Sequence, residues 1–264
     1  MKNKKSLISI IITNYNKGKF LKKSLESALS QNYTNFEIIL FDDCSTDDSL
    51  EIINKFKKIK LIKNKKKKFS SGPLNQINGI LKAYKKSKGD LICLLDSDDK
   101  FTKLKLSKIH KFFTKNPNKK FVVNLTKNNL NFSLKRKSSD VSGWPTIFPT
   151  SCISFRRSFF LEFVKNIKLN SFSNLEIDAR LVIHAYHYSK DFNIISNKLT
   201  DYVKTEDSIS SNYPKFSRKW WSKRKEAFEY LQFILKRKKI MFIKSFDYNL
   251  TNIMYFFLNL LKKD

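Results

Sequence analysis

The chain has 264 residues, of which 41% are hydrophobic, and its 53 Lys and Arg against 23 Asp and Glu give a formal net charge of +30. This length suits one large domain with or without a small appendage, and 24 Phe beside only 5 Gly and 5 Pro exclude a disordered or low-complexity chain. Only seven of the basic residues are Arg, the side chain that base-reading proteins favour, so we expect no nucleic-acid partner.

The first third of the chain alternates between short apolar runs and amphipathic stretches. The runs are β-branched or leucine-rich without polar alternation, as in strands that are buried on both faces. Strands are predicted at 7–13, 36–43, 58–64 and 90–96. Helices are predicted at 14–31, 45–58 and 72–89. Ser45 or Thr46 is expected to cap the second helix. Alternating strands and helices predict βαβ units and a mostly parallel sheet.

The remaining two thirds contain fewer strands and more helices. Helices are predicted at 103–117, where Asn116 and Pro117 stop the pattern, and at 174–189. A strand is predicted at 120–126, and a strand followed by a helix at 149–163. We expect residues 126–148 to form a loop or hairpin that covers a site. The pattern is helical after about residue 212, so we predict an α/β domain over 1–212 and a helical extension over 213–264.

Polar residues gather where three of the predicted parallel strands end. They are Thr13 to Asn16, Asp42 and Asp43, and Asp96 to Asp99. In open α/β sheets, ligands bind at the carboxyl ends of parallel strands. Two carboxylates about 4 Å apart repel each other by roughly 4 kcal/mol at an effective dielectric constant of about 20. The acidic cluster therefore predicts a bound cation.

An aromatic ring, an acid and an acidic cluster at one edge suit a nucleotide. Tyr15 is expected to stack on the base and Asp43 to accept hydrogen bonds from it, with Thr13 and Asn14 beside them. Asp98 is expected to hold a divalent ion that also binds the diphosphate. Carboxylate oxygens are hard ligands, which favour Mg or Mn over Zn.

Four segments together resemble the family-2 inverting glycosyltransferases, which have the GT-A fold. They are "SIIITNYNKGKFLKKSLESALSQNYTNFEIILFDDCSTDDS", "KGDLICLLDSDD", "TSCISFRRS" and "EIDARLVIHAY". The resemblance covers roughly residues 6 to 210, and its first segment is the most specific. It implies a GT-A (Rossmann-like) sheet, a nucleotide-sugar donor, a divalent metal and inversion at the anomeric carbon. It also implies a saccharide or lipid-linked acceptor, as in the synthesis of surface polysaccharide or glycolipid.

Individual roles follow from the resemblance by position. Thr13, Tyr15 and Asp43 would contact the nucleotide, Asp96 would lie near the ribose, and Asp98 would coordinate the metal.

The sequence departs from the family where Cys44 replaces a usual Gly, so the turn after Asp43 must tolerate a side chain. Other departures are Lys103 in place of a frequent Pro, "NQING" in place of a frequent Ala-Arg-Asn, and the lack of a frequent His in "YVKTEDSIS". "NQING" leaves open any contact from Gln76 or Asn78.

The catalytic base must be a carboxylate within about 3 Å of the acceptor hydroxyl. Glu176 and Asp178 in "NLEIDAR" are the candidates, and residues two apart on a helix do not share a face. We therefore expect only one of them to point inward, and the family pattern favours Asp178. The alternative role for Glu176 is a charge at the helix start. Arg180 is expected to orient the base or to bind an acceptor acid.

Two other kinds of function remain as alternatives. A nucleotidyltransferase on a similar sheet would need a Gly-rich phosphate loop after the first strand, and "TNYNKGKF" has one Gly. A degenerate, basic binding module would have lost the acids, which are all present.

His184 and His187 lack further metal ligands nearby, so we expect packing roles for them. The run "KNKKKK" at 63–68 is expected to be a solvated loop.

The cysteines and the apolar runs indicate the cellular compartment of the protein. Cys44, Cys93 and Cys152 form no CxxC pair, as in a reducing compartment. The apolar run at 7–13 is too short for a signal sequence, and no stretch approaches the 18 or so apolar residues of a spanning helix. We expect a cytoplasmic protein. The last helix, which is apolar with flanking Lys, either packs on the domain or a second copy, or contacts the inner face of a membrane.

Overall fold

The computed structural model describes residues 5–127, 147–205 and 208–260. Its centre is one eight-stranded sheet with the order β3-β2-β1-β4-β7-β6-β8-β5. The strands are β1 (Ile8–Asn14), β2 (Phe36–Asp42), β3 (Ile59–Lys63), β4 (Leu91–Asp96), β5 (Lys100–Phe101), β6 (Phe121–Thr126), β7 (Ile153–Arg156) and β8 (Ile194–Asp201). The α-helices are α1 (Gly18–Leu29), α2 (Ser49–Asn54), α3 (Gly72–Lys86), α4 (Lys105–Lys115), α5 (Arg157–Asn166), α6 (Ile177–Ile183), α7 (Arg218–Arg237) and α8 (Phe246–Leu260). Short helical segments are η1 (Thr150–Cys152), η2 (His184–Tyr188) and η3 (Ile209–Asn212).

The first four strands form the parallel half of the sheet. β1 pairs in parallel with β2 and β4, and β2 pairs in parallel with β3. β7 is antiparallel to both β4 and β6, which makes the whole sheet mixed. The parallel sheet predicted from the alternating pattern is thus confirmed for β1 to β4, the strands in roughly the first third of the chain.

Helices cover both faces of the sheet, which explains why its strands are continuous apolar runs. Ile8, Ile10 and Ile12 of β1 pack into a cluster with residues of α1 and α4. Ile11 and Ile39 face the other side and pack against α3, α5 and α6. Both clusters are almost completely excluded from solvent, so the sheet is a rigid support for the residues at its ends.

The second helix begins later than the sequence predicts. α2 starts at Ser49 with Asp48 as its N-cap residue, not with Ser45 or Thr46. The Ser45 hydroxyl instead donates to Asp42 at 2.6 Å, and the Thr46 backbone N–H donates to Asn16 at 2.8 Å. These hydrogen bonds fasten the turn after β2 to the end of β1 and keep it out of the helix.

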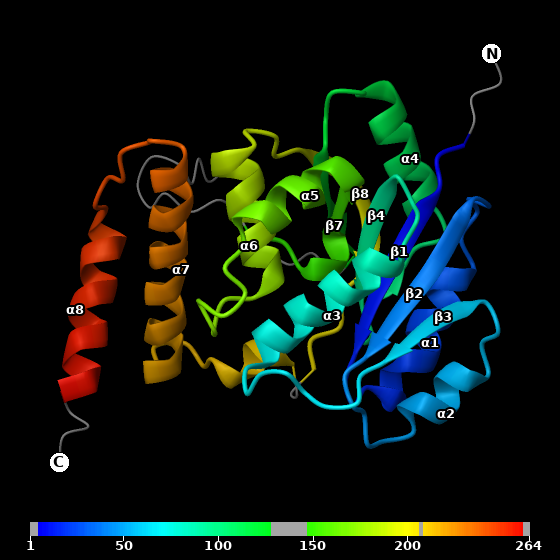
Figure 1. Cartoon of the computed structure of the whole chain (residues 1–264), viewed down its shortest axis with the longest axis horizontal. Helices are drawn as coiled ribbons and strands as arrows, with labels where there is room; N and C mark the ends of the chain where they lie inside the picture. Colours follow the sequence, from blue (N-terminus) through cyan, green and yellow to red (C-terminus); the bar gives the residue numbers. More distant parts are fainter. Residues whose placement is uncertain (1–4, 128–146, 206–207, 261–264) are drawn as a thin grey trace.

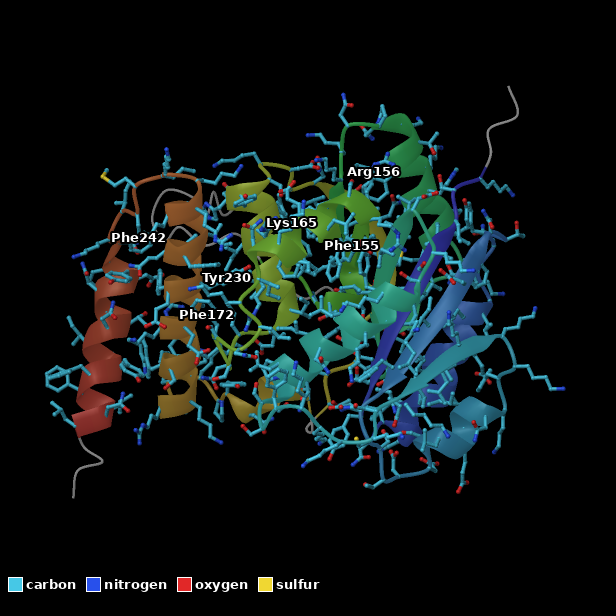
Figure 2. The ribbon with its side chains drawn as sticks, in the orientation of Figure 1. Phe155, Arg156, Lys165, Phe172, Tyr230 and Phe242 are labelled. Carbon is cyan, nitrogen blue, oxygen red and sulfur yellow. The ribbon has the colours of Figure 1, made fainter. Side chains whose placement is uncertain are left out.

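α7 lies beside α6, and α8 lies beyond α7 at the outer edge of the molecule (Figure 1). α7 shares a hydrophobic cluster with α6, and the rings of Phe172 and Tyr230 lie 5.4 Å apart in that cluster (Figure 2). α8 packs along α7. The helical extension is therefore joined to the α/β part by a packed interface, and a boundary between residues 212 and 213 stays a proposal. Within the described residues, no helix is long and apolar enough to cross a bilayer.

Candidate active site

One pocket lies at the carboxyl ends of β1, β2 and β4 and has a volume of about 760 Å³. The pairing register brings these ends together, because Thr13 is opposite Asp96 and Asn14 is opposite Asp42. The pocket is lined by all eight residues that the sequence analysis assigned to nucleotide, metal or base: Thr13, Asn14, Tyr15, Asp43, Asp96, Asp98, Glu176 and Asp178. The last two come from a segment far from the others in sequence, and only the folded chain brings them to the same cavity.

The turn after β2 is held by a network of side chains. Asn14 is 2% exposed and donates to Asp42 at 2.9 Å and to Ser45 at 3.1 Å, so it mainly supports this turn. Asp43 reaches the pocket, and one of its oxygens accepts from Asn64 at 2.7 Å. Cys44 has a positive φ of 62°, the left-handed conformation that Gly adopts without strain. The turn therefore does tolerate a side chain where the family usually has Gly.

The ring of Tyr15 is 44% exposed and borders the pocket. The ammonium of Lys67 lies 3.2 Å from the centre of this ring, in a cation–π contact. The lysine run at 63–68 is largely exposed, as predicted, but Lys67 also lines the pocket. Nothing in the run distinguishes Lys67 from its neighbours, so the sequence alone gave no signal for this contact.

The three acids at the carboxyl end of β4 have three different environments. Asp96 accepts from Gln76 at 2.8 Å, which answers the open question about that residue. Asp98 lies 3.2 Å from the ammonium of Lys17. Asp99 is fully buried and accepts from the backbone N–H of Val203 at 2.8 Å, so it fixes the neighbouring segment and does not line the pocket.

The electrostatics of this cluster favour a bound cation. Burial, followed by the negative charges of Asp99, Asp98 and Asp178, raises the pKa of Asp96 well above its ordinary value. No group of three or more His, Cys, Asp or Glu side chains is placed to hold a metal ion in the described part of the chain. Mg and Mn sites in phosphate-transfer proteins commonly use one or two carboxylates and take further ligands from the substrate phosphates. The donor set therefore fits an ion shared between Asp98 and a diphosphate.

Glu176 and Asp178 both line the pocket, so the expectation that only one points inward is wrong. Glu176 is the N-cap residue of α6 with an extended backbone, and the spacing rule for residues within a helix does not apply to it. Its carboxylate forms an ion pair with Lys223 of α7. Burial, and then the charge of Glu176, raise the pKa of Asp178 to about 7, while Lys223 acts in the opposite direction. A carboxylate poised near neutrality is suited to general-base chemistry.

Arg180 does not line the pocket, so the predicted role of binding an acceptor acid there is wrong. It is fully buried and donates to the backbone carbonyl oxygens of Leu175 at 3.0 Å and Ser171 at 2.9 Å. Arg180 therefore holds the loop that leads into Glu176. Asn78 is also buried away from the pocket, and His184 packs against the rings of Phe159, Phe163 and Tyr188.

Several lining residues were not singled out from the sequence. They include Lys17, Lys67, Phe69, Tyr202 and Lys204. The segment predicted to cover the site, 126–148, falls mostly on 128–146, outside the described residues. Its last residues, Ile147 and Phe148, do line the pocket.

Comparison with known proteins gives one family. The model of "Glycosyl transferase family 2" matches residues 9–176. Over 103 residues the chain is 47% identical to the Escherichia coli UDP-Glc:alpha-D-GlcNAc-diphosphoundecaprenol beta-1,3-glucosyltransferase WfaP, covering 38% of this chain and 39% of that one. It is 36% identical over 109 residues to the putative teichuronic acid biosynthesis glycosyltransferase TuaG of Bacillus subtilis, covering 41% and 42%. The matched part thus spans about two fifths of these relatives.

Solved structures show the same fold. TarS 1–349 from Staphylococcus aureus in complex with UDP-GlcNAc matches with a TM-score of 0.65 at 18% identity, over 96% of this chain and 71% of that chain. The mannosyltransferase PcManGT from Pyrobaculum calidifontis in complex with GDP-Man and Mn²⁺ matches with a TM-score of 0.67 at 12% identity, over 99% and 77%. Because the sequence identities are below 20%, these matches show a shared fold only. The predicted GT-A fold is confirmed.

Proposed function

Because the chain belongs to glycosyl transferase family 2, we propose that it moves a sugar from a nucleoside-diphosphate donor to a hydroxyl of a saccharide or lipid-linked acceptor, with inversion and with a divalent metal. One observation carries this proposal: residues suited to bind a nucleotide and residues suited to act as base line one pocket. Relatives that act in polysaccharide or glycolipid synthesis support it. The UDP-GlcNAc complex of TarS favours a uridine nucleotide as the first donor to test.

The donor is proposed to bind at the ends of β1, β2 and β4. Tyr15 would stack on the base, Asp43 would accept hydrogen bonds from it, and Asp96 would lie near the ribose. Asp98 would hold the divalent ion, and a bound ion would supply positive charge next to the diphosphate leaving group. Lys17, beside Asp98, adds a second positive charge at the same place.

The acceptor is proposed to bind on the α6 side of the pocket. Asp178 takes the proton from the acceptor hydroxyl, and the oxygen of that hydroxyl attacks the anomeric carbon. The bond to the diphosphate breaks on the opposite face, so the configuration at that carbon inverts. The carboxylate of Glu176 is already paired with Lys223, which favours Asp178 over Glu176 as the base.

A thermal-shift screen of nucleotide sugars with Mn²⁺ tests the proposed function. A donor at 100 times its dissociation constant should add about 2.7 kcal/mol to the free energy of unfolding. Stabilisation by one or two nucleotide sugars, lost on addition of chelator, is the expected result. A nucleotidyltransferase would respond to nucleoside triphosphates instead, and a degenerate binding module would respond to none of them.

Tyr15→Ala and Asp43→Ala are each expected to weaken binding of the free nucleoside diphosphate. A stacked base is worth on the order of 1–3 kcal/mol, which corresponds to about a fivefold to 150-fold loss of affinity. Titration calorimetry without any acceptor measures this directly. Tyr15→Phe is the matched control and should bind as the wild type does, because it keeps the ring. Unchanged affinity in both alanine variants would mean that the nucleotide binds elsewhere.

We also propose that α8 contacts an anionic membrane surface. α8 packs on α7 and leaves Phe246, Ile253, Phe256, Phe257 and Leu260 on one exposed face. Basic residues precede it at Lys236, Arg237, Lys238, Lys239 and Lys244. Its one acid, Asp247, is paired with Arg224 at 2.8 Å. Within the part of the chain that the structure describes, these basic side chains form no ion pair. An apolar face beside them suits a lipid surface better than a second copy of the same basic chain. The protein would then work at the cytoplasmic face.

Replacing Phe256 and Phe257 together by Ser is expected to weaken binding to phosphatidylglycerol vesicles by at least tenfold. Burying one Phe side chain contributes about 1.5–3 kcal/mol, and a tenfold change in affinity needs about 1.4 kcal/mol. Vesicle sedimentation measures the loss. Leu161→Ser on α5 is the matched control, because Leu161 is 51% exposed on another helix. If the wild type is a dimer that the double change dissociates, a second copy covers α8 and the membrane proposal fails.

A further inference from the structure

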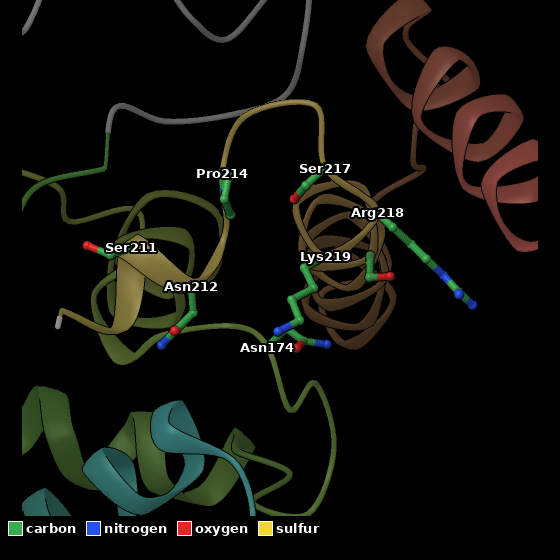
Figure 3. A pocket seen from close by; sticks show the side chains of 8 residues that line it. Asn174, Ser211, Asn212, Pro214, Ser217, Arg218 and Lys219 are labelled. Atoms are coloured by element: carbon green, nitrogen blue, oxygen red, sulfur yellow. The ribbon is translucent and has the colours of Figure 1, made fainter. Parts of the chain in front are cut away.

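A second cleft lies beside the candidate active site, and we propose that it binds the phosphate group of a phosphate-bearing acceptor; this inference rests on the proposed function. The cleft has a volume of about 710 Å³ and lies between the segment around Asn212 and the first turns of α7 (Figure 3). Its lining includes Asn174, Asn212, Ser217, Lys219 and Ser222.

The cleft adjoins the candidate active site. Asn212 lines both cavities. Asn174 lines the cleft, and two residues later Glu176 lines the active-site pocket. On α7, Lys219 lines the cleft, and Lys223, one turn further along the same face, pairs with Glu176. We propose that an acceptor with its reacting hydroxyl at Asp178 extends past Asn212 into the cleft.

Hydrogen bonds hold the wall of the cleft in place. The backbone N–H of Asn174 donates to Glu226 at 2.7 Å, and its side-chain amide donates to the same carboxylate at 2.6 Å. The hydroxyl of Tyr213 donates to the amide oxygen of Asn174 at 3.1 Å. Asn174 is thus anchored on both sides, so a ligand meets a fixed surface there and not a mobile loop.

Lys219 supplies the charge that a phosphate needs. Figure 3 shows its side chain reaching toward Asn174, whereas Arg218 points to the other side and donates to Asn259 of α8 at 3.1 Å. Among the residues that the structure describes, no acid lines the cleft and none forms an ion pair with Lys219. An uncompensated ammonium among hydroxyl and amide groups suits a phosphate, which is bound by charge-assisted hydrogen bonds.

Two sources of the phosphate share this chemistry. The name of the relative WfaP describes a lipid-linked diphosphate acceptor, and the name of TarS describes a poly(ribitol-phosphate) acceptor. The C-terminal end of α8 lies beside the first turn of α7, as the Arg218–Asn259 contact requires. A lipid-linked diphosphate could thus reach the cleft from a membrane that contacts α8. A polyol phosphate would enter it from solution.

The experiment titrates acceptor analogues into the full chain saturated with UDP and Mn²⁺, which blocks the donor side. One arm uses N-acetylglucosamine diphosphate on a short alkyl chain, and the other a ribitol phosphate oligomer, each beside its phosphate-free counterpart. We expect Lys219→Ala to lower affinity for the bound phosphate analogue about tenfold, as loss of a charged hydrogen bond predicts, and to leave the phosphate-free counterpart unaffected. Lys219→Arg should keep most of the affinity. Lys111→Ala, an exposed lysine of α4, is the matched control.

Each outcome decides between the proposals. Loss of affinity for only one phosphate analogue identifies the source of the phosphate. Equal binding by Lys219→Ala and the wild type, or failure of the wild type to bind either phosphate analogue, overturns the cleft proposal. UDP binding by the wild type is measured in the first step of the same titration. Its absence contradicts the proposed function, whereas UDP binding with an unaffected Lys219→Ala variant contradicts the cleft alone.

Discussion

Asp178→Asn is expected to lower the rate of sugar transfer by about 100-fold or more, the usual effect of losing a general base. The amide cannot take the proton from the acceptor hydroxyl. The change therefore destabilises the transition state of transfer but not the complex with the bound donor. Nucleotide-sugar affinity should not change, because the groups that are proposed to bind the nucleotide come from β1, β2 and β4. Transfer of labelled sugar measures the rate, and donor hydrolysis serves until an acceptor is found.

The pH dependence gives a second readout for Asp178. Its raised pKa, about 7, means that the base form increases as the pH rises through neutrality, so the transfer rate should rise from pH 5 and level off above about 8. Lys223 lowers this pKa through its positive charge, and Lys223→Ala should therefore move the rise to higher pH. A structural role for Lys223 alone would lower the rate without moving the profile.

Glu176→Gln is the matched comparison for Asp178→Asn. If Glu176 serves mainly to bind Lys223, this change should lower the rate much less. An inactive Glu176→Gln with an active Asp178→Asn would reverse the assignment of the base and keep the enzyme class. An active protein that tolerates both changes would contradict the inverting mechanism.

Asp98→Asn is expected to remove metal-dependent donor turnover, with a loss of about 100- to 1,000-fold as for other groups that stabilise developing charge. The fold should be kept, because relief of repulsion with Asp96 offsets loss of the ion pair with Lys17. Turnover is measured with excess Mn²⁺ and again with excess chelator, and thermal unfolding checks that the variant is folded.

Lys17→Met tests whether a metal ion or the Lys17 ammonium is the cation that neutralises the diphosphate. If a metal neutralises the diphosphate, chelator should abolish wild-type turnover and Lys17→Met should keep most of it. Wild-type turnover in chelator, together with an inactive Lys17→Met, would show that Lys17 is the essential cation and would contradict the metal role of Asp98.

The sequence by itself determined the parallel half of the sheet and the group of pocket residues that is proposed to bind the nucleotide. A buried parallel strand is visible as a run such as 7–13, and the residues that follow each strand must meet at one edge, because parallel strands all end there. Thr13, Tyr15, Asp43, Asp96 and Asp98 could therefore be grouped from local patterns alone. The family resemblance added Asp178, for which no local pattern exists.

Only the tertiary structure decided which partner each charged residue has. Glu176 pairs with Lys223, Asp98 with Lys17 and Asp96 with Gln76, across segments that are remote in sequence. Apolar periodicity fixes which face of an element is buried, but not how two packed elements are offset. A shift of one helical turn, about 5.4 Å, would replace one ion pair by another. For the same reason the cleft at Lys219 and the inward burial of Arg180 could be known only from the packed positions of α6 and α7.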